Sequence, residues 1–190
     1  MKLYRKASDT NRALLYATLI NFLIILCWIV VFKVNRSWVP EMKEYFTSRP
    51  FSARIGNNLI PGYSMFNVFK NKEFSFTSDH TLNVLAFIPF GILLPYFYTK
   101  NKYLYSALTF IGATLFFEVF QLITAIGYFD SSDLLTNTLG GAIGLLLYLL
   151  VFSKLKGNAV NVISTIVNVI ATPFSLYAIY NTLLHIDYYI

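Results

Sequence analysis

Long apolar segments separated by polar links dominate the chain. Each of the five segments approaches or exceeds the ~20 residues that an α-helix needs to cross the ~30 Å hydrocarbon core of a bilayer. The pattern therefore predicts an all-α fold, a polytopic membrane bundle of about five transmembrane helices. The segments cover roughly residues 13–32, 82–98, 103–125, 133–152 and 160–184.

Prolines interrupt two of these segments. The second segment, which is the shortest, contains Pro89 and Pro95, and the fifth contains Pro173. Proline removes a backbone donor, and membrane helices tolerate it where neighbouring groups bond the freed carbonyl oxygens. We therefore expect a kink in each of these two helices.

Composition agrees with a membrane location. Of the 190 residues, 56% are hydrophobic and 13% are charged, which is too little charge to cover a soluble domain of this length. The single cysteine, Cys27, lies within the first apolar segment, so neither an intrachain disulfide nor a thiol metal site is expected. No small-residue cleavage site follows that segment, and we interpret it as an uncleaved signal anchor. We expect one membrane domain over residues 1–190.

The net charge of +6 is concentrated between the apolar segments. Loops rich in lysine and arginine stay on the cytoplasmic side of a membrane. The charge pattern therefore predicts a multi-pass protein of the cell membrane with a cytoplasmic N-terminus and an extracellular C-terminus, and it gives no reason to expect a nucleic-acid partner. The residues that set this orientation are Lys2, Arg5, Lys6, Arg12, Lys100, Lys102, Lys154 and Lys156.

With this orientation, the long link over residues 33–80 lies outside the cell. It also carries basic residues, but long loops have less influence than short ones on the orientation of a membrane protein. Its stretch "WVPEMKEYF" fits an amphipathic helix on the membrane surface. The stretch "NLIPGYSMFNVF" is too apolar for solvent and too short to span the bilayer. We expect it to form an interfacial or re-entrant segment.

Carboxylates and an amide lie at the start of the fourth segment. At 100° per residue, Asp130, Asp133 and Asn137 fall within ~60° of one another on one helix face. Gly140, Gly141 and Gly144 continue this stripe. The Gly-x-x-x-Gly spacing lets another helix approach closely, so the polar face is expected to point into the bundle.

The third segment supplies a complementary face. Glu118 lies 15 residues beyond Tyr103, about 22 Å from the cytoplasmic end at 1.5 Å per residue, and Asn137 should lie at a similar depth. An unpaired carboxylate in a membrane costs at least ~2.5–3.5 kcal/mol on insertion scales. The face comprises Ala107, Ile111, Thr114, Glu118, Gln121 and Ala125. The candidate ligand-binding residues are therefore Glu118, Gln121, Asp130, Asp133 and Asn137, with Asn83 and His80 from the second segment and Arg54 from the preceding link.

Structural alternatives apply to five of these residues. Asp130 and Asp133 are also suited to capping the N-terminus of a helix. Asn137 and Gln121 also suit hydrogen bonds between helices. Glu118 is a functional residue by default at this depth, and its structural alternative is a neutral acid bonded to Gln121 or Asn137.

Three stretches carry a resemblance to a known family. "NVLAFIPFGILLPYF", "FEVFQ" and "GYFDSSDLLTNTLGG" resemble blocks of the VanZ-like membrane proteins, which are named for a teicoplanin-resistance protein. Arg54 with residues 58–61 matches a weaker block, so the resemblance covers residues 54 to about 150. Many family members carry an arginine where this chain has Gly127, and Arg54 is the candidate to replace it. The resemblance implies a membrane protein linked to resistance against glycopeptide antibiotics.

Three functions are compatible with this pattern. The preferred one is binding, without a cofactor, of a membrane lipid, a lipidated glycopeptide or a cell-wall lipid precursor in an outer-leaflet groove, with Arg54 available for phosphate. The alternative is a metal-dependent enzyme that modifies an envelope lipid, with Mg²⁺ or Ca²⁺ held by Asp130, Asp133, Glu118 and Asn137. An ion-coupled transporter is disfavoured, because the cytoplasmic halves of the third and fourth segments are apolar.

Overall fold

A computed structural model describes residues 11–30, 79–124 and 129–184, together with Ser48, Leu59, Phe66 and Lys70. The three continuous ranges are almost entirely helical and contain no strand, which confirms the predicted all-α class. Arg54, the surface-helix and re-entrant stretches of the long link and the two chain ends lie outside the described residues. The elements are α1 (Arg12–Val30), α5 (Asp79–Leu93), η2 (Leu94–Tyr96), α6 (Lys102–Thr124), α7 (Ser131–Leu150), η3 (Phe152–Lys154) and α8 (Gly157–Leu184).

Four of the predicted spans are long and apolar enough to cross a membrane, and the remaining one is shorter. The four cover Arg12–Ile29, Lys102–Ile123, Ser131–Lys154 and Gly157–Leu184. The shorter apolar helix covers His80–Tyr96. Its α-helical part ends at Leu93 and is followed by η2, which contains Pro95; proline cannot donate the backbone hydrogen bond that would continue the α-helix.

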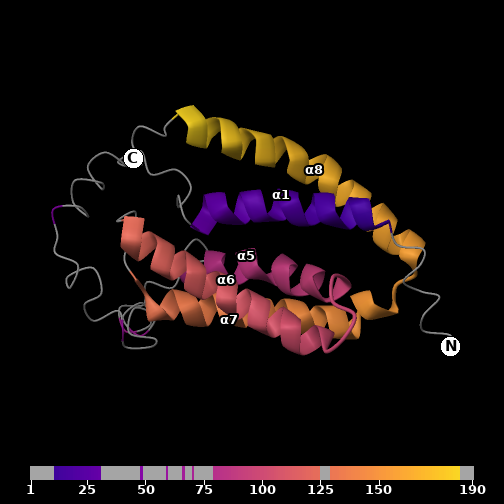
Figure 1. The fold of residues 1–190 in the computed structure, drawn as a ribbon, viewed down its shortest axis with the longest axis horizontal. Helices are drawn as coiled ribbons and strands as arrows, with labels where there is room; N and C mark the ends of the chain where they lie inside the picture. Colours follow the sequence, from indigo (N-terminus) through magenta and orange to yellow (C-terminus); the bar gives the residue numbers. More distant parts are fainter. Residues whose placement is uncertain are drawn as a thin grey trace.

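Helices α8, α1, α5 and α7 pack side by side in that order, and α6 packs against α7 and α5 (Figure 1). In Figure 1, α1 lies between α8 and α5, while α5, α6 and α7 lie together. A mainly aromatic core joins α1, α5 and α6, and it includes Leu26, Phe87, Phe90, Phe110 and Phe117. Large aromatic side chains bury much surface per residue, so this core fixes α1 and α6 against the shorter α5.

Glycines bring α5 and α7 into backbone contact. A β-carbon added to Gly144 would collide with the carbonyl oxygen of Ile88, and one added to Gly140 would collide with that of Val84. The reverse holds for Gly91, whose added β-carbon would meet the backbone of α7. The predicted close helix approach is therefore confirmed, and α5 is the partner helix.

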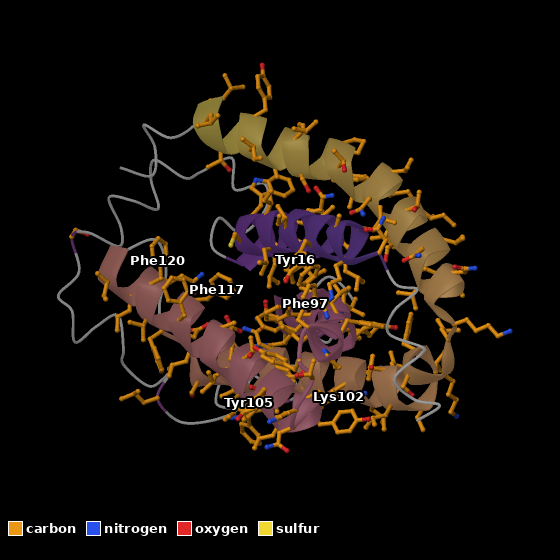
Figure 2. The ribbon with its side chains drawn as sticks, turned by 45° about the vertical axis from the view of Figure 1, so that its right-hand side comes forward. Tyr16, Phe97, Lys102, Tyr105, Phe117 and Phe120 are labelled. Atoms are coloured by element: carbon orange, nitrogen blue, oxygen red, sulfur yellow. The ribbon has the colours of Figure 1, made fainter. Side chains whose placement is uncertain are left out.

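Polar side chains hold α8 against α1. The Asn21 amide nitrogen lies 3.1 Å from both the Asn168 side-chain oxygen and the Thr172 hydroxyl. Asn168 donates to the carbonyl oxygen of Leu14, and Ser175 donates to that of Asn21. Such bonds matter in lipid, because apolar surface alone gives helices no reason to associate there. Figure 2 shows many α8 side chains pointing away from α1.

The described helices carry different charged residues at their two ends. We call the end where α6 begins and α7 finishes the basic end. There the Lys102 ammonium lies 3.2 Å from the Tyr148 hydroxyl and 5.0 and 5.1 Å from the ring centroids of Tyr148 and Tyr103. Cations stacked on tyrosines are common at membrane–water interfaces. The opposite end, where α7 begins, carries Asp130 and Asp133 and is called the acidic end.

Candidate functional site

Asp130 caps helix α7. Its backbone is extended, with φ −125° and ψ 111°, and its carboxylate accepts a hydrogen bond from the Ser132 backbone N–H at 2.7 Å. A side-chain oxygen at this position satisfies one of the amide donors that a helix leaves unpaired at its start. The capping alternative considered for Asp130 is therefore what the structure shows.

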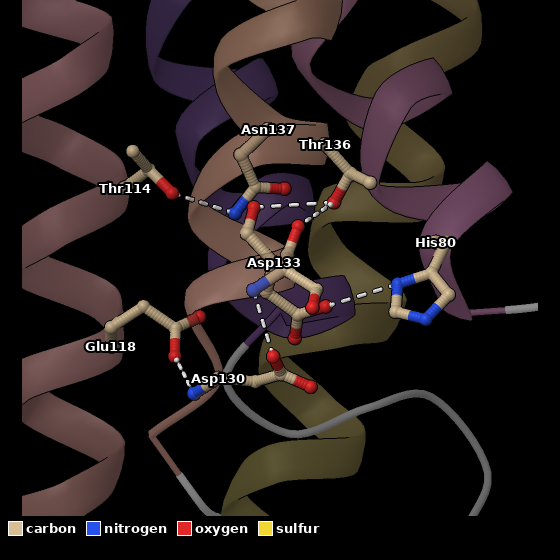
Figure 3. A network of polar contacts seen from close by, with 8 residues as sticks. His80, Thr114, Glu118, Asp130, Asp133, Thr136 and Asn137 are labelled. Carbon is tan, nitrogen blue, oxygen red and sulfur yellow. Dashed lines mark hydrogen bonds and ion pairs between the residues drawn. The ribbon is translucent and has the colours of Figure 1, made fainter. Parts of the chain in front are cut away.

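Glu118 reaches this cap from α6. Its side chain is fully buried, and its Oε2 accepts the backbone N–H of Asp130 at 2.8 Å. The residue lies 16 positions after Lys102, which is about 24 Å along the helix axis at 1.5 Å per residue. Amide groups at a helix start carry partial positive charge, so the Glu118 carboxylate is placed where the fold favours an anion. Figure 3 shows this contact between α6 and the start of α7.

Asp133 connects α7 to α5. Its carboxylate lies 3.6 Å from Nδ1 of His80, and its side chain is 9% exposed against 17% for His80. His80 is in the first turn of α5, so this contact joins the acidic ends of the two helices (Figure 3). Two residues taken from separate segments of the sequence are thus brought together.

Asn137 pairs with α6 one turn deeper in the bundle. Its side-chain amide donates to the Thr114 hydroxyl at 2.7 Å, and both side chains are fully buried. Thr114 is one turn nearer the basic end than Glu118, whereas the sequence placed Asn137 level with Glu118. Helix periodicity along the sequence does not determine the register of two neighbouring helices.

Two buried oxygen atoms at this end have no hydrogen-bond partner among the residues that the structure describes. They are Oδ1 of Asn137 and Oγ of Ser132. The Thr136 hydroxyl, by contrast, lies within hydrogen-bond distance of the carbonyl oxygens of Ser132 and Asp133. A buried polar atom without a partner costs about 1–3 kcal/mol, so these two oxygens are candidate contacts for a ligand or a water molecule.

The other predicted site residues that the structure describes are also buried. Gln121 is 2% exposed on α6 and Asn83 is 8% exposed on α5. Ser132 was missed by the sequence analysis. The signal for it is the row of small residues at four-residue spacing from Ser132 through Thr136 to Gly140, because such spacing lines one helix face.

We call the group made by His80, Thr114, Glu118, Asp130, Asp133 and Asn137 the acidic-end cluster. Its three carboxylates come from α6 and from the start of α7. Within the described ranges, no three His, Cys, Asp or Glu side chains are grouped as ligands for a metal ion.

The fold and this cluster define a polytopic helical membrane protein with a buried polar site at one end. The chain belongs to the VanZ/LLP1 family, whose model matches residues 19–152. It is 32% identical over 127 residues to Protein VanZ of Enterococcus faecium, and the match covers 67% of this chain and 68% of that relative. No solved structure matches the chain. The family match begins within α1 and ends in η3, so it includes the whole acidic-end cluster and leaves out α8.

Proposed function

We propose that this protein confers or modulates resistance to teicoplanin-type glycopeptide antibiotics by binding an amphiphile at the acidic-end cluster. The amphiphile is either the lipidated antibiotic itself or an envelope lipid such as a cell-wall precursor. Membership of the VanZ/LLP1 family supports the link to resistance. The binding mode is argued from the cluster.

The observation that carries the proposal is the complete burial of Glu118 beside two further acidic residues at one end of an apolar bundle. Placing a carboxylate at membrane depth is costly, and such residues usually mark a binding or transport site. The partial exposure of His80 and Asp130 gives a ligand head group access from the end of the bundle. An acyl chain would then lie along the apolar outer surface of the helices.

The proposal includes an orientation. With the N-terminus in the cytoplasm, the lysines of the basic end face the cytoplasm, as basic loops generally do. The acidic-end cluster then faces the outer leaflet, where a cell-wall antibiotic and its lipid-linked target are accessible. The described lysines on which this rests are Lys100, Lys102, Lys154 and Lys156.

The experiment is antibiotic susceptibility of cells that express Glu118→Gln at wild-type membrane levels. Glutamine keeps the shape of the side chain and can still accept the Asp130 N–H, so folding should be retained. We expect loss of teicoplanin resistance, because the negative charge that meets the ligand is removed. Thr182→Val is a control in α8, outside the family match, and should keep resistance. Full resistance with Glu118→Gln would contradict the proposal.

A further inference from the structure

The helices that begin at the basic end start with positive charge. Arg12 and Lys102 are the first residues of α1 and α6, and Lys156 directly precedes α8 (Figure 1). None of these three helices has an acidic residue in its first turn. The start of a helix is the positive end of its dipole and favours negative charge. The two helices that begin at the acidic end follow this preference, since Asp79 opens α5 and Asp130 caps α7.

The sequence supplies little negative charge that could balance the basic end. It contains no acidic residue over residues 80–117 or 134–186, the two stretches that include the loops of this end. Residues 1–11 contain three basic residues and one acidic residue, Asp9. The long link over residues 31–78 joins the end of α1 to the start of α5, and both of these points lie at the acidic end. The excess of positive charge therefore belongs to the sequence around the basic end as well as to the described helices.

Tyrosine side chains hold one of these cations in place. Lys102 is half-buried, and its ammonium lies 3.2 Å from the Tyr148 hydroxyl and 5.1 Å from the ring centroid of Tyr103. Tyr148 is 5% exposed, and its ring meets that of Tyr96 edge-on with 5.0 Å between the centroids. The Tyr96 hydroxyl in turn donates to the carbonyl oxygen of Phe152. The position of the Lys102 charge is thus fixed by buried rings, unlike that of a lysine in solvent.

Lys102 and Tyr148 together present hydrogen-bond donors. An ammonium carries three N–H donors, and a tyrosine hydroxyl carries one O–H donor. The Tyr148 oxygen accepts from Lys102, so its own hydrogen points elsewhere. Among the described residues, this hydrogen has no acceptor and Lys102 has no carboxylate partner. An anion at the start of α6 would meet a full charge, a hydroxyl donor and the partial positive charge of the helix start.

We propose that the start of α6 binds the phosphate group of an anionic phospholipid through Lys102 and Tyr148. This second site is separate from the acidic-end cluster and goes beyond the proposed function. Leu104 and Leu108 are 56% and 55% exposed on α6, so an acyl chain can lie along the helix next to the bound phosphate. Basic sites at helix ends are suited to anionic head groups. A zwitterionic lipid would instead bring a second cation among the lysines.

The experiment compares phosphatidylglycerol with phosphatidylcholine. The purified full-length protein is incorporated into phosphatidylcholine nanodiscs that contain an increasing fraction of phosphatidylglycerol, and its melting temperature is measured. A ligand that binds the folded state raises its stability in a saturable way. We expect a saturable rise for the wild type. Inorganic phosphate added to the protein in pure phosphatidylcholine should produce no such rise, because it lacks the acyl chains.

Substitutions assign the rise to the site. Lys102→Gln and Tyr148→Phe should each lose most of it, the first through the charge and the second through the hydroxyl. Lys100→Gln is the matched control, because it removes the same charge from an exposed lysine two positions away and should keep most of the rise. Each variant is compared with itself in pure phosphatidylcholine, so its intrinsic stability does not enter. Tyr148→Phe keeps the buried ring and gives a readout if Lys102→Gln does not fold.

Three results would overturn the site. Equal losses in Lys100→Gln and Lys102→Gln would show that the charged surface as a whole attracts the lipid. A full rise in Tyr148→Phe, which leaves the net charge unchanged, would show that the hydroxyl does not take part. Stabilisation by inorganic phosphate equal to that by phosphatidylglycerol would show that a free anion, and not a lipid, is bound. These readouts are independent of antibiotic resistance, so their failure would leave the proposed function of the acidic-end cluster as it stands.

Discussion

Glu118 has one observed structural role and one proposed role in binding. Its carboxylate accepts the Asp130 backbone N–H and so holds the start of α7 against α6. The same carboxylate is the buried negative charge on which the proposed function depends. Because hydrogen bonding and charge can be removed separately, the structural task and the binding task can be distinguished by two substitutions.

We predict that Glu118→Gln melts close to the wild type and that Glu118→Leu melts several degrees lower. Leucine leaves the Asp130 N–H without its acceptor, and an unsatisfied buried donor costs about 1–3 kcal/mol. The measurement is thermal unfolding of both variants in detergent under identical conditions. Equal melting of the two variants would show that the bond to Asp130 contributes nothing to stability.

At the scale of helices, the close packing of α5 on α7 organises the bundle. Gly140 and Gly144 place α7 directly against the carbonyl oxygens of Val84 and Ile88. In a membrane, packing of this kind replaces the hydrophobic effect as the main source of helix association. The same contact brings His80 on α5 beside Asp133 on α7, so the stability of the bundle and the geometry of the cluster depend on one interface.

The second prediction compares two glycines. Gly144→Ala should lower the melting temperature by several degrees, because the new methyl group collides with the Ile88 backbone. Gly112→Ala is the matched control, since an added β-carbon there meets nothing within 4 Å. Replacing glycine with alanine within a helix favours the helix by up to ~1 kcal/mol, so Gly112→Ala should melt at or above the wild-type temperature. A Gly144→Ala protein as stable as Gly112→Ala would contradict the packing described above.

The sequence predicted the helices well and their rotation less well. The burial of Glu118 and Asn137 and the close approach at Gly144 followed from polar and small residues at helical spacing. Ile111 was expected on the inward face of α6 but is 42% exposed, while Phe110 and Phe117 enter the core. Lipid and protein interior are both apolar, so apolar side chains do not reveal which face of a membrane helix is buried. The pairing of Asn137 with Thr114 depends on the register between α6 and α7, which helix periodicity does not determine.

At the scale of the whole molecule, polar groups occupy the two ends of the described contact face between α6 and α7, and an aromatic contact separates them. Phe110, which is 3% exposed, packs against Gly141 between the Thr114–Asn137 pair and the Lys102–Tyr148 pair. Within the described helices, this contact interrupts the polar residues of that face. The arrangement favours a site that receives a ligand from one side of the membrane over a pathway that crosses it.

The last prediction concerns which side that is. α7 has 20 residues, which span about 30 Å at 1.5 Å per residue, so positions just before and after it lie on opposite sides of the bilayer. Cys27 is the single cysteine of the chain, and Cys27→Ala provides a background without thiols. Phe129→Cys and Lys156→Cys then report the acidic and basic ends, and neither removes the Asp130 cap.

We expect a membrane-impermeant maleimide to label Phe129→Cys on intact cells, and to label Lys156→Cys only after the cells are opened. This follows from the lysines of the basic end, which should remain in the cytoplasm. A denatured sample of each variant serves as the control for thiol reactivity, because a half-buried cysteine reacts slowly whichever side it faces. The reverse labelling pattern would place the acidic-end cluster at the inner leaflet. An antibiotic that acts outside the cell would then not reach it, and a lipid of the inner leaflet would be the ligand to test.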